Sequence, residues 1–212
     1  MATRSVIFDL DGTLIDSASS ILVSIKSAFE AIGIHPAKSL TPALIGPPLA
    51  ETLTKLLSAQ DANHLPKLVE LFKHHYDEIG YRDTRVYAGV EQMLEVLSRQ
   101  GVRLYIATNK RIVPTRRIVR HLGLVDLFHG VYALDYWTPS LPNKAAMLSR
   151  LKNEVQTIER RVIYVGDRAE DAEAASACGM PFVWAAWGYA TEIKDRGEIN
   201  QITIPSQLFN FA

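Results

Sequence analysis

Short apolar segments recur along the chain and end in polar or turn-forming residues. The first spans residues 5–9, and similar segments lie at 102–107, 131–134, 161–165 and 181–185. Continuous apolar runs of this length are typical of parallel strands buried on both faces. The segments between them carry apolar residues at helical spacing, as at 93–97, 112–122 and 145–151. Strands that alternate with helices predict βαβ units, so we expect an α/β fold with three layers, a parallel sheet between two layers of helices.

Residues 17–82 interrupt this alternation. The interval has no strand-like segment, and its apolar residues follow helical spacing near its start, as in Ile21, Leu22, Ile25, Ala28, Phe29 and Ile32. Further helices are predicted at 49–57 and 65–79. About 65 residues are too many for an ordinary connection between a strand and a helix. We therefore predict a small helical domain at 17–82, inserted into a core formed by residues 1–16 and 83–212.

Composition and charge narrow the classes of function. The 212 residues carry 23 basic and 23 acidic side chains, a formal net charge of zero. This balance argues against binding of a nucleic acid polymer or of an anionic membrane surface, and it leaves monomer and homodimer open. No apolar run approaches the ~20 residues that span a bilayer. Residues 1–4 lead directly into a strand-like segment without a signal-peptide pattern, so we expect a cytoplasmic protein.

Polar residues gather where the predicted strands end. Since ligands of parallel α/β sheets bind at the carboxyl ends of the strands, these residues are candidates for a common site. They are Asp9 and Asp11 after the first strand, Thr108 and Asn109 after the second, Lys144 at a helix start, and Asp167 and Asp171 after a later strand. A cluster of carboxylates repels itself unless it binds a cation with oxygen ligands, and Mg²⁺ is the obvious candidate.

These residues carry a family resemblance. Residues 6–14, with the sequence VIFDLDGTL, resemble the first motif of the haloacid dehalogenase-like phosphatases. Thr108 is similar to their second motif, Lys144 to the third, and Gly166-Asp167 with Asp171 to the fourth. The resemblance implies a Rossmann-like core, with a helical cap of the C1 type at 17–82. Ala107-Thr108-Asn109-Lys110, Trp187-Gly188-Tyr189 and residues 45–49 of the cap are similar to the branch that includes phosphoglycolate phosphatases and some nucleotidases.

The resemblance also implies roles for the carboxylates. Asp9 would be the nucleophile that takes up the phosphoryl group, and Asp11 the general acid and then the general base. Mg²⁺ would be held by the side chains of Asp9 and Asp167 and by the backbone carbonyl of Asp11. Asp171 would act through metal-bound water. Arg168 departs from the pattern, since serine or threonine often stands there.

Positive charge and hydrogen-bond donors are needed around the phosphoryl group. A carboxylate about 4 Å from a phosphate dianion is repelled by about 4 kcal/mol per charge pair at an effective dielectric constant of 20. By the resemblance, Lys144 would supply charge beside the metal, and Thr108 and Asn109 would hold the phosphoryl oxygens. The loop of the predicted cap, Gly46, Pro47 and Pro48, is expected to contact the substrate.

The resulting prediction is an enzyme, a Mg²⁺-dependent hydrolase of a small phosphorylated metabolite such as phosphoglycolate or a nucleoside monophosphate. Two alternatives stay open: a phosphomutase of the same family, similar to β-phosphoglucomutase, and a non-catalytic binding module. Plainer interpretations also exist for single residues. Lys110 can be a surface charge, and Phe29, Phe72 and Tyr76 are interpreted as core side chains.

Overall fold

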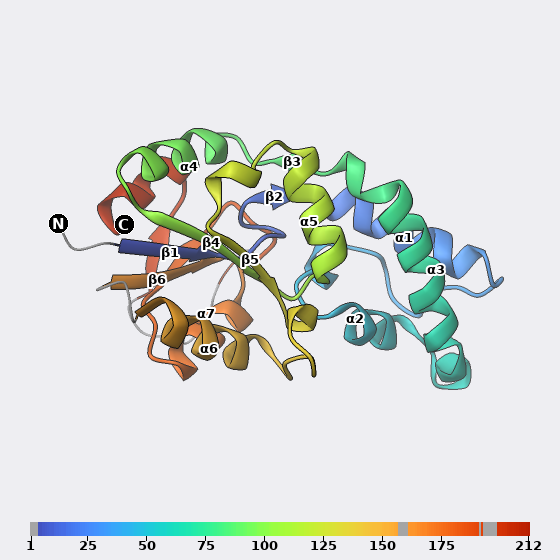
Figure 1. The fold of residues 1–212 in the computed structure, drawn as a ribbon. Helices are drawn as coiled ribbons and strands as arrows, with labels where there is room; N and C mark the ends of the chain where they lie inside the picture. Colours follow the sequence, from blue (N-terminus) through green and yellow to red (C-terminus); the bar gives the residue numbers. More distant parts are fainter. Residues whose placement is uncertain (1–3, 157–160, 191, 193–198) are drawn as a thin grey trace.

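A six-stranded parallel sheet forms one half of the molecule (Figure 1). The computed structural model describes residues 4–156, 161–190, 192 and 199–212. The strand order is β5-β4-β1-β6-β7-β8, and every neighbouring pair is parallel. The strands are β1 (Arg4–Phe8), β4 (Arg103–Thr108), β5 (Gly130–Ala133), β6 (Arg161–Gly166), β7 (Phe182–Ala185) and β8 (Asn200–Ile202). The predicted α/β class with a parallel sheet is therefore confirmed.

Helices cover both faces of this sheet. Helices α4 (Val90–Arg99) and α5 (Ile112–His121) pack on one face, and α6 (Lys144–Gln156) and α7 (Ala169–Ala177) on the other. Because side chains alternate along a strand, β1 serves both layers: Val6 and Phe8 belong to the first apolar cluster and Ile7 to the second. The predicted three layers are therefore present.

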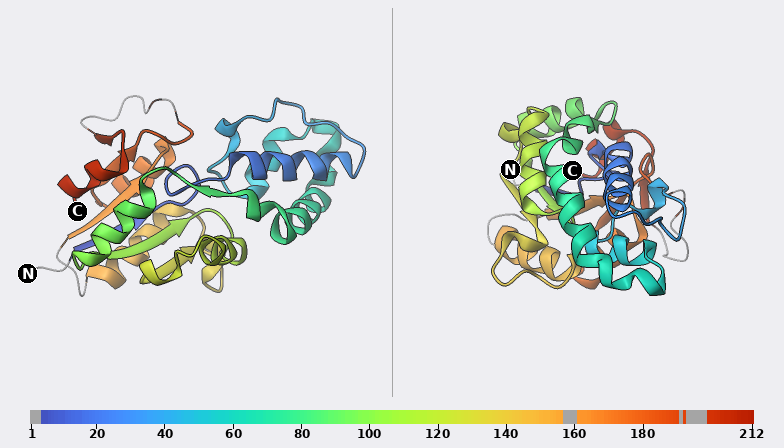
Figure 2. Two further views of the ribbon diagram at one scale, coloured as in Figure 1. Left: turned by 90° about the horizontal axis from the view of Figure 1, so that it is seen from above. Right: turned by 90° about the vertical axis from the view of Figure 1, so that its right-hand side faces the viewer.

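Residues 17–82, which we call the helical insert, lie beyond one end of the sheet, as the left-hand view of Figure 2 shows. The insert contains α1 (Ala18–Glu30), α2 (Leu49–Leu56) and α3 (Leu65–Glu78), with 3-10 turns at Pro42–Leu44, Ala59–His64 and Gly80–Asp83. Helices α1 and α3 bury Phe29 and Tyr76, each 1% exposed. The predicted helices of this interval are thus confirmed. We call the remaining described residues the sheet half.

Two very short strands mark where the chain enters and leaves the insert. Strand β2 (Ile15–Asp16) pairs antiparallel with β3 (Arg85–Val86). The sequence pattern does not predict these two strands or β8, because segments of two or three residues carry no readable period. The 3-10 turns at Val125–Leu127, Leu134–Tyr136 and Pro205–Asn210 are not predicted either. None of the helices in the described part of the chain has the length and apolar character needed to cross a membrane.

Candidate active site

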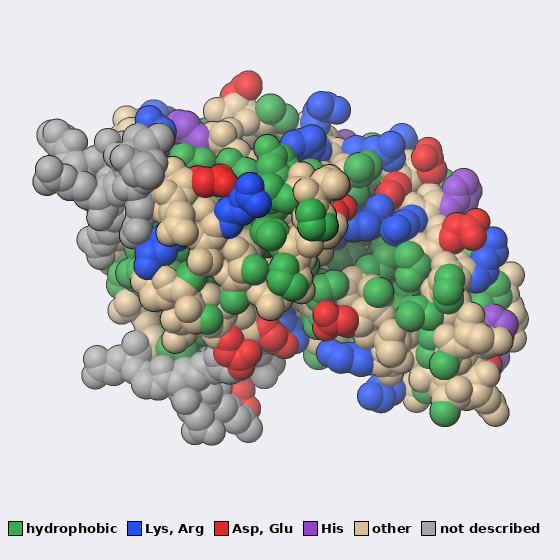
Figure 3. Space-filling view, turned by 60° about the horizontal axis from the view of Figure 1, so that its bottom comes forward, with side chains coloured by type: hydrophobic (Ala, Val, Ile, Leu, Met, Phe, Trp, Pro, Cys, Tyr) green, Lys and Arg blue, Asp and Glu red, His purple; other side chains and the backbone are tan. Residues whose placement is uncertain are grey.

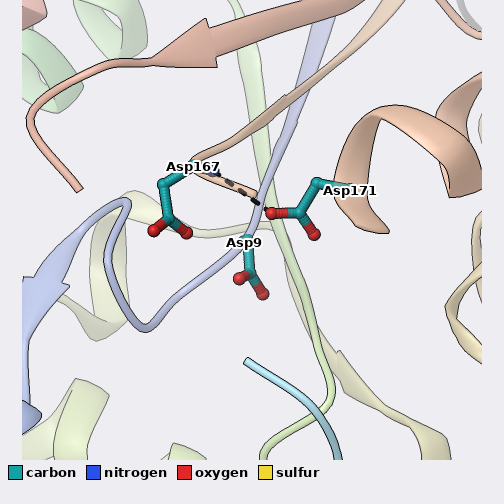
Figure 4. A group of neighbouring side chains, drawn as sticks. All are labelled: Asp9, Asp167 and Asp171. Carbon is teal, nitrogen blue, oxygen red and sulfur yellow. Dashed lines mark hydrogen bonds between the residues drawn. The ribbon is translucent and has the colours of Figure 1, made fainter. Parts of the chain in front are cut away.

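Three buried carboxylates converge at the end of the sheet that faces the insert (Figure 4). Asp9 directly follows β1 and Asp167 directly follows the neighbouring β6, while Asp171 lies in the first turn of α7. One carboxylate oxygen of each residue lies within 4.8 Å of the other two. All three residues are at most 2% exposed. The structure thus brings together the carboxylates that the sequence analysis assigned to one site.

Glycines permit this close approach. Gly12 has a φ of +85°, and a Cβ there would overlap the carboxylate of Asp167. A Cβ on Gly188 would also overlap Asp167 and would meet the Gly12 carbonyl. The motif glycine at position 12 is therefore required twice, for a left-handed turn and for the space that Asp167 occupies.

The Asp171 carboxylate is saturated by donors. Its Oδ1 accepts from Lys144 Nζ at 2.6 Å and from the Tyr164 hydroxyl at 3.3 Å. Its Oδ2 accepts from the backbone N–H groups of Asp167 and Arg168, at 3.2 and 3.1 Å. Asp171 therefore holds the loop after β6 in place. These contacts agree with an indirect role at a metal ion, the role that the family resemblance implies for this residue.

The carboxylates of Asp9 and Asp167 have fewer hydrogen-bond donors around them than the carboxylate of Asp171. Among the described residues, Oδ1 of Asp167 and Oδ1 of Asp9 accept no hydrogen bond, although Lys144 Nζ lies 3.0 Å from the latter. Burial raises the pKa of Asp9 to about 7; Lys144 opposes the shift, and Asp171 and Asp11 add to it. Burial, with Asp171 and Asp9, also raises the pKa of Asp167. A buried Asp167 oxygen without a donor, in a site where burial disfavours the charged forms of Asp9 and Asp167, fits a hard divalent cation.

Lys144 is the cation of this cluster. Its side chain is 8% exposed, and its Nζ lies between Asp9 and Asp171. Burial opposes the charged form of Lys144, but the two carboxylates outweigh burial and raise the pKa of Lys144 above its usual value. Lys144 therefore carries its charge next to the predicted nucleophile.

Thr108, predicted to bind phosphate, ends β4 and is 2% exposed.

Among the described residues, Asp11, the predicted acid and base, is held through one carboxylate oxygen, Oδ1. Its Oδ1 accepts from Ser17 Oγ at 2.5 Å and lies 3.1 Å from Lys110 Nζ. The interpretation of Lys110 as a surface charge is wrong, since its side chain is only 8% exposed.

Ser17 and Tyr189 are site residues that the sequence analysis did not assign. The backbone N–H of Ser17 donates to the Tyr189 hydroxyl at 2.8 Å, and the backbone N–H of Tyr189 donates to Asp167 Oδ2 at 2.7 Å. The Trp187-Gly188-Tyr189 sequence was noted as a family feature, but nothing in the pattern indicated that it would contact a carboxylate.

The insert closes over these residues. A cavity of about 70 Å³ lies between the two halves and is lined by Asp11, Tyr76, Asn109 and Lys110 together with apolar side chains. Gly46 and Pro47 line it too, while Pro47 and Pro48 line a second, more open cavity that reaches Lys144. Figure 3 shows a hollow where the two halves meet, with acidic and basic side chains interspersed on that face.

Two side chains of the sheet half donate hydrogen bonds to backbone carbonyls in the loop of the insert that precedes α2. Asn109 Nδ2 donates to the Gly46 carbonyl at 2.9 Å, and Arg168 Nη1 donates to the Ile45 carbonyl at 2.5 Å. The side-chain nitrogen of Asn109 is thus engaged with the insert, and its expected contact with phosphate stays a prediction. Arg168, the departure from the family pattern, reaches a part of the chain that a serine at this position could not.

The fold and site define an α/β protein with a buried acidic cluster at the carboxyl edge of its sheet, covered by a helical insert. The model of the haloacid dehalogenase-like hydrolase family matches residues 6–185. The chain belongs to this family.

Individual relatives carry different names. The chain is 34% identical over 185 residues to tyrosine-protein kinase PtkA of Mycobacterium tuberculosis, covering 87% of this chain and 62% of the kinase. It is 31% identical over 192 residues to a phosphoglycolate phosphatase of Cereibacter sphaeroides, covering 87% and 85%. A haloacid dehalogenase-like hydrolase of Streptococcus pneumoniae superposes with a TM-score of 0.86 at 23% identity, over 99% of this chain and 98% of that one. The last likeness concerns the fold alone.

Proposed function

We propose that the protein is a phosphatase that hydrolyses a small phosphomonoester with the help of Mg²⁺, and that residues 17–82 act as its cap domain. The observation that carries the proposal is the ion pair of Lys144 with Asp9, beside a buried Asp167 oxygen that accepts no hydrogen bond from the described residues. Membership of a hydrolase family and the similarity to a phosphoglycolate phosphatase support the same activity.

The first step is phosphoryl transfer to Asp9. A carboxylate oxygen of Asp9 attacks phosphorus while the bond to the ester oxygen breaks, and the departing oxygen takes a proton from Asp11. Lys144, with Thr108 and Asn109, stabilises the charge on the phosphoryl oxygens. Asp9, Asp167 and the backbone carbonyl of Asp11 would hold Mg²⁺, which would supply further positive charge against the repulsion between carboxylate and phosphate.

The second step is hydrolysis of the aspartyl-phosphate. Asp11, now ionised, takes a proton from a water molecule as that water attacks phosphorus. The bond between phosphorus and the Asp9 oxygen breaks, so inorganic phosphate leaves and both aspartates regain their starting states. The cavity of about 70 Å³ and its apolar walls favour a small alcohol as the leaving group.

Transfer to a second hydroxyl group in place of water is the alternative, as in a mutase or a kinase. The similarity to a protein named tyrosine-protein kinase is the observation that favours it. Both reactions share the aspartyl-phosphate on Asp9 and differ only in the acceptor. The ratio of phosphate released to substrate consumed distinguishes them, since hydrolysis gives one phosphate per substrate and transfer gives less.

The test is phosphate release from a panel of phosphoglycolate, nucleoside monophosphates and sugar phosphates, with Mg²⁺ and with a chelator. Asp9→Asn removes the nucleophile with little change in shape, and Asp126→Asn is a matched change at an exposed aspartate. We expect release that requires Mg²⁺, is lost in Asp9→Asn and is kept in Asp126→Asn. No release from any compound, or equal release by Asp9→Asn, would refute the proposal.

A further inference from the structure

Lys110 is a buried lysine that no step of the proposed reaction uses. Its Nζ lies 3.1 Å from Asp11 Oδ1 and donates to the Tyr76 hydroxyl at 3.0 Å. It also lies 4.6 Å from the centre of the Tyr76 ring. Burying an ammonium group is costly unless partners replace its water. Here a carboxylate, a hydroxyl and the face of an aromatic ring replace it.

These partners come from opposite sides of the cavity. Asp11 belongs to the sheet half, whereas Tyr76 lies on α3 of the insert, where it stacks on Phe72 with ring centres 5.2 Å apart. Only a docked insert brings the Tyr76 hydroxyl to Lys110. The residues that follow Lys110 and Tyr76 in the chain also contact each other, because Arg111 forms an ion pair with Asp77. Lys110 therefore contacts both the insert, through Tyr76, and the predicted acid/base carboxylate of Asp11.

We propose that Lys110 is a positioning residue that makes the orientation of Asp11 depend on docking of the insert. The inference rests on the proposed function, in which Asp11 transfers the proton. Lys110 and Ser17 both engage Oδ1 of Asp11, and this fixes the rotation of the carboxyl group. The other oxygen, Oδ2, is then the one that exchanges the proton with the ester oxygen and with water.

The contact with Tyr76 links this orientation to the insert. When α3 moves away, Lys110 loses the hydroxyl and the ring that replace its water, and the ammonium group becomes hydrated. Its hold on Asp11 weakens as a result. The general acid is therefore in place only when the insert is docked against the sheet half.

The leaving group provides the test, because a poor leaving group needs protonation by Asp11 and a good one needs it little. We would measure kcat/KM, which reports the first chemical step, for p-nitrophenyl phosphate and for the alkyl phosphate that the wild type hydrolyses fastest. We expect Lys110→Met to lose about 100-fold on the alkyl ester and less than about tenfold on the aryl ester. Lys110→Arg should recover part of the alkyl activity.

Tyr76→Phe tests the link to the insert, since it removes only the hydroxyl and keeps the ring. It should show the same leaving-group bias in a weaker form, and it should add little further loss in Lys110→Met. Lys67→Met, an exposed lysine on the same helix, is the control and should leave both substrates unaffected.

Two outcomes would overturn the inference: equal losses on both esters in Lys110→Met, or independent, multiplying effects of Tyr76→Phe and Lys110→Met. A wild type that hydrolyses no phosphate ester would refute the proposed function instead.

Discussion

Arg111 and Asp77 form a two-pronged ion pair between the sheet half and the helical insert, with nitrogen–oxygen distances of 3.0 and 2.6 Å. The two side chains are 23% and 17% exposed, so solvent screens them only in part. Arg117 adds a hydrogen bond to the Asp77 carbonyl. This ion pair joins α3 to the residue that precedes α5, and Arg111 also lines the cavity.

Breaking this pair should loosen the docked insert. We expect Asp77→Asn to lower kcat/KM about three- to tenfold, chiefly through KM, and to weaken the dependence of kcat/KM on salt concentration. Glu70→Gln breaks an exposed ion pair with Lys67 on the same helix and should change neither. An Asp77→Asn enzyme with unchanged KM and unchanged salt dependence would contradict a role of this pair in closure.

Removing Lys144 should impair both stability and catalysis. Lys144→Met leaves Asp9 and Asp171 without their buried cation, which we expect to cost about 3–5 kcal/mol of unfolding free energy. Phosphate release should fall by about 100-fold or more, because charge beside the phosphoryl group is lost. Thermal unfolding and initial rates measure the two effects. Lys26→Met, at an exposed position on α1, should behave as the wild type; a stable and active Lys144→Met would contradict the assignment.

The raised pKa of Asp9 predicts how pH affects the metal-free protein. Between about pH 4 and 7 the folded protein keeps a proton on Asp9 that the unfolded chain has released. Its stability therefore falls as the pH rises through this window, by at most about 4 kcal/mol. Mg²⁺ should reverse the loss above pH 7, because it binds the ionised carboxylate of the folded state.

The measurement is the melting temperature at about pH 5 and about pH 7.5, with Mg²⁺ and with a chelator. We expect Mg²⁺ to stabilise the wild type more at the higher pH, and Asp9→Asn to flatten the pH dependence without metal. A metal-free wild type that gains stability between these pH values would contradict the raised pKa of Asp9.

Alanine substitutions at two glycines distinguish the effect of backbone strain from the effect of crowding at the predicted metal site. Gly12 and Gly33 both have left-handed φ angles, +85° and +69°, but a Cβ on Gly33 would meet no atom within 4 Å. Both alanine variants should lose about 1 kcal/mol of unfolding free energy from strain. Only Gly12→Ala should also lose Mg²⁺ affinity, measured by calorimetry, because its methyl group displaces Asp167. Equal Mg²⁺ affinity in the two variants would refute this explanation.

Much of the fold followed from short-range patterns. Buried runs such as residues 161–165 indicated strands because the central strands are covered on both faces. The helical spacing of 17–32 indicated a helix because one side of α1 is buried and the other carries exposed polar residues. The carboxyl edge of a parallel sheet then brought Asp9 and Asp167 together without knowledge of side-chain contacts. Side-chain contacts between segments that are distant in the sequence could not be predicted. Nothing local distinguishes Lys110 from a surface lysine, since its burial depends on Tyr76, 34 residues earlier in the chain.

The antiparallel pairing of β2 with β3 has a consequence for how such proteins diversify. Since the chain leaves the sheet half at Ile15–Asp16 and returns alongside at Arg85–Val86, the two chain connections of the segment between them lie side by side. A segment whose two ends are neighbours can be exchanged as a cassette without rerouting the chain around it. Recombination between relatives, or grafting in the laboratory, could thus replace the helical insert that covers the cavity, while the carboxylates at the edge of the sheet stay unchanged.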